Sequence, residues 1–301
     1  MNTGSFLSRT RWALLPALFF ASFSSIHAQQ PPKPKPLPTV TEEHAQVIRG
    51  FIGAKLTAAP KKARKVLVFS RCEGYVHGEG IVYCNKLLEL AATTGAYAVH
   101  FSTDYADLTN TASLAQYDAL VINNATQLKT KEHPTLAAAL TDYVKAGHGL
   151  CAIHAAADSF YQAPEVAEMI GGLFDGHPWG GGGTWAMKLD DPDNVLNRTL
   201  KTVPLKFGDE IYQQKSPPYD RQKLHVLVSL DLNDKATAEA KKQKREDKDY
   251  AVSWIRSYGK GRVFYTSFGH DKRAFMNPAT AWHILDGLQY TLGDLDVKTT
   301  K

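Results

Sequence analysis

The stretch Gly147-His148-Gly149-Leu150-Cys151-Ala152-Ile153-His154-Ala155-Ala156-Ala157-Asp158 decides the fold class. Its short apolar run, opened by Gly-x-Gly, predicts a buried parallel strand, and the small residues that follow predict a tight strand-to-helix turn. In an open α/β sheet such a turn lies at the carboxyl ends of the strands, where ligands bind. A nucleophile elbow places Ser or Cys at this turn. Here the position is held by His154, which indicates different chemistry.

Strands and helices alternate on both sides of this stretch. The predicted strands of the first half cover 65–70, 97–101, 117–124 and 149–154, and the predicted helices cover 81–94 and 134–145. In the less regular second half we expect strands over 184–189 and 224–230, a charged insertion over 236–249, a hairpin of 250–258 with 262–268, and a closing helix over 279–292. The alternation predicts an α/β fold with a doubly wound, mostly parallel sheet, to which the hairpin and glycine-rich loops are added.

The N-terminal residues predict export. Residues 1–28 have two early arginines, an apolar stretch over 12–23 and a small residue, Ala28, suited to cleavage, as in a secretory signal. The apolar stretch is shorter than the ~20 residues of a membrane span, so we expect no stable span after cleavage, the alternative being an uncleaved anchor. Residues 29–63 read as a Pro/Lys-rich spacer and N-terminal segment, and order is expected to begin near Thr41 or Lys65. We therefore predict one domain over residues 64–295. The predicted signal segment implies a periplasmic or secreted location.

Charge and cysteine content narrow the classes of partner. The net charge of +5 is mild, and no basic stripe with interleaved aromatic residues is present, which argues against nucleic-acid binding. In an exported protein Cys72 and Cys84 can pair or stay free, whereas Cys151 lies within a predicted strand and reads as a small buried residue. A small molecule is the expected partner, and a homo-oligomer is compatible with the sequence.

Histidines and carboxylates gather where predicted strands end. Because parallel strands share one carboxyl edge of a sheet, we expect His77, His154 and His270 to meet there as ligands of a divalent metal ion such as zinc. Imidazole and carboxylate are also the usual acids and bases near neutral pH. The candidate catalytic residues are His154, Glu210, Asp209, His177 and Asp158. No His-Glu-x-x-His or Cys-x-x-Cys motif is present, so a structural role for each histidine is the alternative.

Other histidines and several aromatic residues lack such a placement. The histidines expected to be structural or exposed are His100, His133, His148, His225 and His283. Four aromatic side chains either form an apolar wall for a sugar ring or pack in the core: Tyr161, Trp179, Trp185 and Tyr212.

Together these segments resemble the ThuA-like family, named for trehalose utilisation. The resemblance covers residues 64–295 and rests on Gly74-Tyr75-Val76-His77, the Gly149-to-Asp158 segment, Gly171-Gly172-x-Phe174-x-x-His177, Asp209-Glu210-Ile211-Tyr212, and Gly261-Arg262-Val263-Phe264-Tyr265 before Gly269-His270-Asp271. It implies a flavodoxin-like variant of the class I glutamine amidotransferase fold. That fold's elbow has Gly-x-Cys-x-Gly, and here Ile153-His154-Ala155 occupies the matching place, so thiolate chemistry is not expected.

The resemblance also implies a substrate class, namely glycosides or disaccharides and their 3-keto derivatives. A ketone at C3 makes the C2 proton acidic, so a base can remove it and the glycosidic oxygen at C1 can leave, with a metal ion acting as Lewis acid. We expect metal-assisted lyase, hydrolase or isomerase chemistry, and the alternative is a carbohydrate-binding module without catalysis. A two-carboxylate glycosidase is disfavoured, because the adjacent Asp209 and Glu210 would point to opposite faces of an extended segment.

Overall fold

The decisive stretch forms β4 (Gly149–Ile153), whose five residues are all buried. The computed structural model describes residues 1–2 and 36–297, and the fold below is that of the unit that starts at Leu37. Nine strands form one sheet in the order β2-β1-β3-β4-β9-β8-β7-β5-β6. Their bounds are β1 (Lys65–Phe69), β2 (Ala98–Ser102), β3 (Ala119–Asn123), β5 (Trp185–Leu189), β6 (Lys206–Phe207), β7 (His225–Leu230), β8 (Ala251–Tyr258) and β9 (Gly261–Thr266).

The first five strands of that order pair in parallel, in the 2-1-3-4-5 arrangement of flavodoxin-like folds with β9 in the fifth place. The remaining strands pair antiparallel: β8 forms the expected hairpin with β9, and β7, β5 and β6 extend the sheet beyond it. The predicted α/β class is therefore confirmed, with parallel pairing confined to one half of the sheet.

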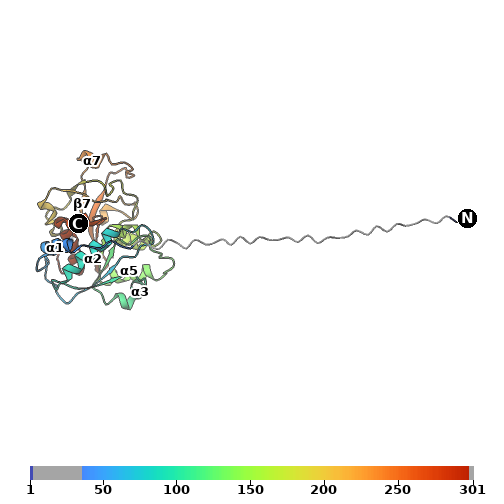
Figure 1. Ribbon diagram of the computed structural model, residues 1–301, viewed down its shortest axis with the longest axis horizontal. Coiled ribbons are helices and arrows are strands. Elements are labelled where there is room, and N and C mark those ends of the chain that lie inside the picture. The colour runs from blue at the N-terminus through green and yellow to red at the C-terminus, as the bar shows by residue number, and fades with distance from the viewer. Residues whose placement is uncertain (3–35, 298–301) are drawn as a thin grey trace. The chain divides into compact units, whose positions relative to one another are not determined.

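Helices cover both faces of the sheet, as predicted. Their bounds are α1 (Glu42–Ile52), α2 (Gly78–Ala92), α3 (Ala106–Thr109), α4 (Thr111–Leu114), α5 (Leu136–Lys145), α6 (Pro164–Ile170), α7 (Lys235–Ala238), α8 (Lys272–Met276) and α9 (Pro278–Leu292). Short 3-10 segments cover His154–Asp158, Val195–Asn197, Leu200–Thr202 and Arg221–Lys223. In Figure 1, α1 and α2 lie together, α3 and α5 lie together, and α7 lies at the opposite end of the domain from α3.

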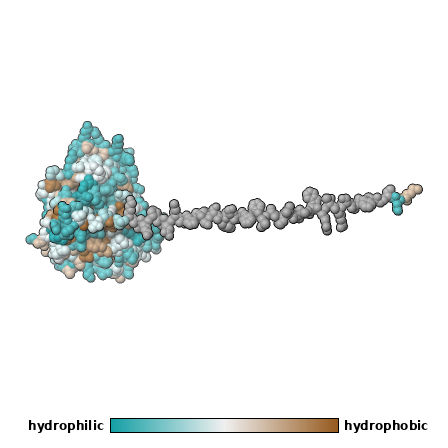
Figure 2. Space-filling view, in the orientation of Figure 1, coloured by the Kyte–Doolittle hydropathy of each residue, from teal (hydrophilic) through white to brown (hydrophobic). Residues whose placement is uncertain are grey.

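Two apolar clusters form the core, one on each face of the sheet. In β1, Val66 and Val68 join the cluster that contains α1, α2 and α9, whereas Leu67 and Phe69 join the cluster that contains α3, α5 and α6. Successive strand residues point to opposite faces, so the buried residues 66–69 of β1, which contact both clusters, are all apolar. On the face drawn in Figure 2, hydrophilic residues surround small hydrophobic areas.

The N-terminal helix α1 is part of this domain although it precedes residue 64. The Thr41 side chain caps it by accepting a hydrogen bond from His44 N, and Ile48 and Ile52 are buried against the core. The signal segment predicted over residues 1–28 lies outside the described residues apart from the first two. Among the residues that the structure describes, no helix is long and apolar enough to cross a membrane.

The three cysteines are free. Cys84 is completely buried on α2, and the Cys72 thiol donates to the backbone oxygen of Asn124, at 3.2 Å. The pairing of Cys72 with Cys84 that the sequence left open is therefore absent, because the two sulfurs face different surroundings. Cys151 is buried in β4, as expected.

Candidate functional site

His154 stands at the turn where β4 ends. It is the first residue of the 3-10 segment His154–Asp158, is completely buried, and has a left-handed backbone with φ of 47°. The next three residues are alanines that are also buried. Side chains this small allow the chain to turn sharply at the carboxyl end of β4. His154 Nδ1 lies 2.6 Å from the backbone oxygen of Ser267, which leaves Nε2 directed at the site. A rare backbone conformation held by packing is typical of functional positions.

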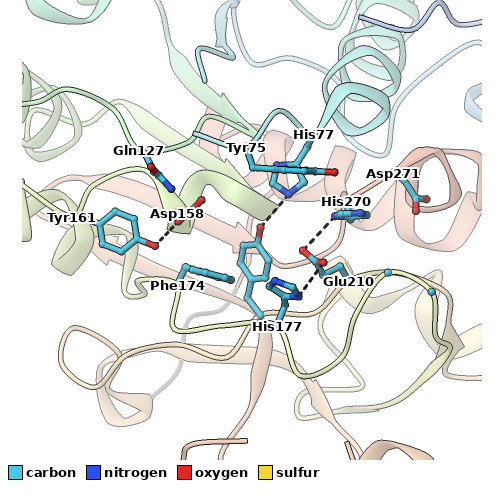
Figure 3. Close-up of a pocket in the computed structure, with 13 residues that line it drawn as sticks. Tyr75, His77, Gln127, Asp158, Tyr161, Phe174, His177, Glu210, His270 and Asp271 are labelled. Atoms are coloured by element: carbon cyan, nitrogen blue, oxygen red, sulfur yellow. Dashed lines mark hydrogen bonds and ion pairs between the residues drawn. The ribbon is translucent and has the colours of Figure 1, made fainter. Parts of the chain in front are cut away.

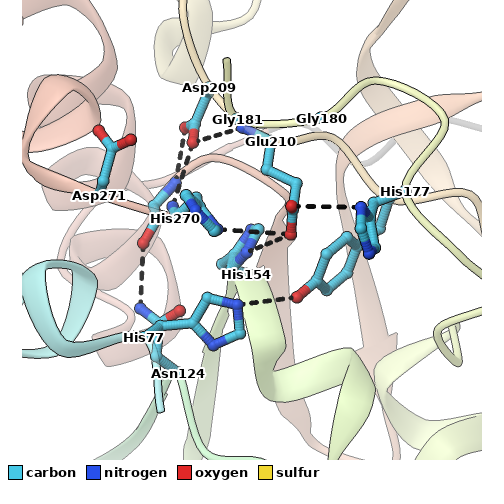
Figure 4. Close-up of polar contacts among 12 residues, drawn as sticks. His77, Asn124, His154, His177, Gly180, Gly181, Asp209, Glu210, His270 and Asp271 are labelled. Atoms are coloured by element: carbon cyan, nitrogen blue, oxygen red, sulfur yellow. Dashed lines mark hydrogen bonds and ion pairs between the residues drawn. The ribbon is translucent and has the colours of Figure 1, made fainter. Parts of the chain in front are cut away.

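Three further segments bring side chains to the same point. His77 precedes α2, His270 follows β9, and Glu210 lies between β6 and β7. One ligand atom from each of these residues and one from His154 lie within 4.8 Å of one another (Figure 4). The three histidines that were expected to meet, His77, His154 and His270, therefore do lie together, and Glu210 lies with them.

Glu210 is the centre of this cluster. Its Oε1 lies 3.4 Å from His270 Nδ1 and 3.7 Å from His154 Nε2, and its Oε2 lies 3.3 Å from His177 Nδ1. Glu210 was a second choice in the sequence pattern, as a candidate catalytic residue, and its position is one from which it could also ligate a metal ion. The signal it gave was weak, because Glu210 follows a two-residue strand in an irregular segment.

The residues present fit a metal ion. His77 Nδ1, His154 Nε2 and His270 Nδ1 are buried and have no hydrogen-bond partner among the described residues. Because the Nδ1–H of His154 is used on Ser267, its Nε2 carries a lone pair that faces the carboxylate oxygen of Glu210 across 3.7 Å. The lone pairs of His154 Nε2 and the Glu210 oxygen repel each other unless a proton or a cation lies between them. A histidine ligand whose second nitrogen donates to a carbonyl is the usual arrangement at metal sites.

Burial and mutual proximity also set the charge states. Burial, followed by the neighbouring His154 and His270, lowers the pKa of His77 to about 2, so its imidazole is neutral and able to ligate. Burial opposes ionisation of Glu210, but the nearby imidazoles of His154 and His270 outweigh it and lower the pKa of this carboxyl. For His270, burial opposes protonation, and the Glu210 carboxylate outweighs it and raises the pKa of the imidazole.

Asp209 supports the cluster without joining it. Its carboxylate accepts hydrogen bonds from the backbone N–H of Gly269 at 2.8 Å and of His270 at 3.1 Å. On the other side, Asn124 Nδ2 donates to the backbone oxygen of Gly269 at 3.1 Å. Burial raises the pKa of Asp209 to about 6. Asp209 therefore positions the turn that carries His270, and it does not line the pocket, although the sequence analysis placed it among the catalytic candidates.

The cluster opens into a pocket of about 700 Å³. Figure 3 shows the histidine cluster at one end, with Asp158, Tyr161 and Gln127 at the other. His177, half-exposed in the glycine-rich loop, lies beside Glu210, and Asp271 follows His270 at the rim. Of the sequence-predicted site residues, all but Asp209 and the fully buried His154 line this pocket: His77, Asp158, His177, Glu210 and His270.

The predicted aromatic wall is half correct. Tyr161 and Tyr212 line the pocket, but Trp179 is completely buried and its Nε1–H donates to the Thr237 carbonyl, and Trp185 does not line the pocket. Large apolar side chains near a glycine-rich loop give no sequence signal that separates core from cavity. Two lining aromatics were missed, Tyr75 and Phe174, which lie two residues before His77 and three before His177.

The other histidines lie outside the pocket lining, in agreement with the structural or surface role expected of them. His283 is buried between Ser253 Oγ and the Leu196 carbonyl, both at 2.8 Å, and His225 Nε2 lies 2.7 Å from Asp191. His148 Nδ1 lies 2.8 Å from the Tyr117 carbonyl, and His100 is exposed.

The fold and the site define an α/β protein with a flavodoxin-like half-sheet, in which the turn after β4 carries a buried histidine. Comparison of sequences then gives the family: the profile of the ThuA family, described as trehalose utilisation, matches residues 65–291, and the chain belongs to that family. A comparison with curated proteins finds no match.

Solved structures agree on the fold. A putative ThuA-like protein from Bacteroides uniformis superposes with a TM-score of 0.61 at 20% identity, covering 79% of this chain and 94% of the other. A second, from Parabacteroides merdae, gives a TM-score of 0.58 at 18% identity, covering 80% and 94%. At these identities the likeness extends to the fold alone.

Proposed function

We propose that this protein is a carbohydrate-processing enzyme that holds a divalent metal ion and acts on a keto-glycoside or keto-disaccharide. The observation that carries the proposal is that His154 Nε2 and His270 Nδ1, both buried and without a hydrogen-bond partner among the described residues, converge on Oε1 of Glu210 at 3.7 Å and 3.4 Å. The family description, trehalose utilisation, supports a sugar as the substrate. The pattern of residues 1–28 supports export to the periplasm or the medium.

The donor set supports a first-row transition metal. His77, His154 and His270 offer imidazole nitrogens, which suit zinc, iron and similar ions, and Glu210 offers a hard oxygen. Zinc is our first choice. When bound, such an ion would act as a Lewis acid on a carbonyl oxygen of the substrate.

The protein's own groups supply the proton transfer. His177 Nδ1 faces Glu210 Oε2, which leaves His177 Nε2 free to accept the C2 proton of a 3-keto sugar. As that C–H bond breaks, its electron pair forms the C1–C2 double bond, the C1–O bond breaks, and the leaving oxygen takes a proton from water. The products are an unsaturated keto sugar and a free sugar. Glu210 holds the imidazole of His177 in position for this transfer.

The test combines metal analysis with turnover. We expect the purified protein to contain about one transition-metal ion per chain by elemental analysis, and a 3-keto-disaccharide to release free sugar in a chelator-sensitive reaction. His154→Ala should abolish both, and His100→Ala, which changes an exposed histidine on β2, should abolish neither. Full turnover by the chelated enzyme would overturn the proposal. Saturable sugar binding without product or bound metal would replace it by a carbohydrate-binding module.

A further inference from the structure

The pocket has a second end that the proposed chemistry does not use. Asp158 is the last residue of the 3-10 segment that His154 begins, so about 2 Å of rise per residue separates the two by roughly 8 Å along the segment. Tyr161, Phe174 and Gln127 line the pocket around Asp158. The volume of about 700 Å³ lies within the range of roughly 300–1,000 Å³ that pockets for drug-sized ligands have. The pocket therefore has room for a ligand of two rings.

One oxygen of the Asp158 carboxylate receives no hydrogen bond from the described residues. Only 7% of the residue is exposed, and the Tyr161 hydroxyl donates to its Oδ1. Among the described residues, no Lys, Arg or His forms an ion pair with Asp158 and no hydrogen bond is made to its Oδ2. Burial raises the pKa of this carboxyl, as expected of a carboxylate without a cationic partner. A ligand with neighbouring hydroxyl groups would supply the donors that the protein does not.

The aromatic side chains at this end are held in place rather than loose. Tyr161 is 40% exposed although its hydroxyl is fixed by Asp158 and Lys215 Nζ lies 5.6 Å from its ring centroid. The Phe174 ring packs edge-on against Tyr212 with centroids 4.5 Å apart. A fixed apolar ring beside a hydrogen-bond acceptor suits the apolar face and the hydroxyl edge of one sugar unit.

We propose that Asp158, Tyr161 and Phe174 form a subsite for an uncharged second sugar unit, which stacks on an aromatic ring and donates hydroxyl hydrogen bonds to Asp158 Oδ2. The identity of the reacting unit at the histidine end rests on the proposed function. The charge requirement follows from the lining: its residues include Asp158, Glu210 and Asp271 but neither lysine nor arginine, the side chains that bind phosphate. A phosphorylated second unit would meet the Asp158 carboxylate and be rejected.

The test is a binding measurement by calorimetry on the full protein, with trehalose, glucose and trehalose 6-phosphate as probes. We expect trehalose to bind about tenfold more tightly than either of the other two, a difference of about 1.4 kcal/mol. Asp158→Asn and Tyr161→Ala should each weaken trehalose binding about tenfold, whereas Tyr161→Phe, which keeps the ring, should lose less. Phe101→Ala is the matched control, because Phe101 is 39% exposed on β2 and does not line the pocket.

The outcomes separate this inference from the proposed function. Metal content, measured on the same samples, should be unchanged in Asp158→Asn and Tyr161→Ala, since neither residue belongs to the histidine cluster. Weaker trehalose binding in these variants would support the subsite even if the protein held no metal and turned over no substrate. Trehalose that binds no better than glucose, trehalose 6-phosphate that binds as well as trehalose, or folded variants that bind trehalose like the wild type would each overturn it.

Discussion

His154 Nδ1–H donates a 2.6 Å hydrogen bond to the backbone oxygen of Ser267, and this bond fixes the tautomer of the imidazole. A carbonyl oxygen only accepts, so Nδ1 carries a proton, and in the neutral imidazole the lone pair on Nε2 faces Glu210. Ser267, the residue after β9, would therefore orient His154 as a ligand of the proposed metal ion.

Gly269→Ala should destabilise the protein and weaken metal binding together. Gly269 has φ of 127°, and a Cβ there would lie 2.9 Å from Ile153 Cγ2 and 3.5 Å from His154 Cβ. We expect a loss of about 1–3 kcal/mol in the free energy of unfolding, measured by urea denaturation. The matched control is Gly50→Ala in α1, where nothing lies within 4 Å, and where alanine should stabilise by about 0.5–1 kcal/mol. Equal stability of Gly269→Ala and the wild type would show that a Cβ at position 269 causes no backbone strain or steric clash.

Asp209→Asn should lower metal affinity while the fold is kept. The carboxylate holds the N–H groups of Gly269 and His270, and an amide can accept at only one oxygen, so the turn that carries His270 loosens. We expect the affinity for the metal ion to fall roughly 10- to 100-fold, which is typical when a residue that holds a metal ligand in place is mutated. A competition titration against a chelator measures this affinity. Asp234→Asn, at the N-cap of the remote helix α7, is the matched control and should bind metal normally. An unchanged affinity in Asp209→Asn would assign that residue to stability alone.

His283 should contribute to acid sensitivity. Burial lowers the pKa of His283 to about 4, below its ordinary value of 6.5, so the unfolded chain binds a proton that the folded chain does not. Its contribution to stability is therefore present above pH 6.5 and is lost as the pH falls toward 4. Between pH 7 and 4.5 the wild type should lose about 2 kcal/mol more stability than His283→Gln, measured by urea denaturation at each pH. Asp209 and Asp286, whose raised pKa values act in the opposite direction, cancel in this difference.

The cysteines should all be reduced without added reductant. Burial raises the pKa of the Cys84 and Cys151 thiols, and burial likewise raises that of Cys72. Alkylation followed by mass spectrometry should show a label on all three cysteines in denaturant. In the native protein, no cysteine other than the partly exposed Cys72 should be labelled. Cys72→Ser should then remove the native label. A single label in the denatured protein would indicate a disulfide, and a label on Cys151 alone would identify the pairing of Cys72 with Cys84.

Local patterns predicted much of the fold. The apolar runs of β1, β3 and β4 are buried on both faces, so each reads as strand without knowledge of its neighbours. The meeting of His77, His154 and His270 was predictable from one general fact, that parallel strands share a carboxyl edge. The short helices α3, α4 and α6 were missed because four to seven residues carry too little periodicity.

The position of Glu210 was harder to predict, because it depends on the antiparallel half of the sheet. Its segment is aligned by a bridge between Ile211 and Trp179 and by the bond from Tyr212 N to Ser267 Oγ, both of which are contacts over long sequence separations. Neither contact produces a periodic pattern of apolar residues in the sequence of residues 206–214. The same holds for Asp209, whose carboxylate meets backbone groups of another loop.

The wide spacing of the cluster along the chain would tie binding of the proposed metal ion to folding. Its four members come from positions 77, 154, 210 and 270, so no short peptide of this chain contains even two of them. An unfolded chain would have to close loops of many tens of residues to assemble the same site, and it would bind the ion weakly. An ion that prefers the folded state in this way raises the melting temperature with its concentration, so thermal denaturation can report occupancy of the site before any substrate is known.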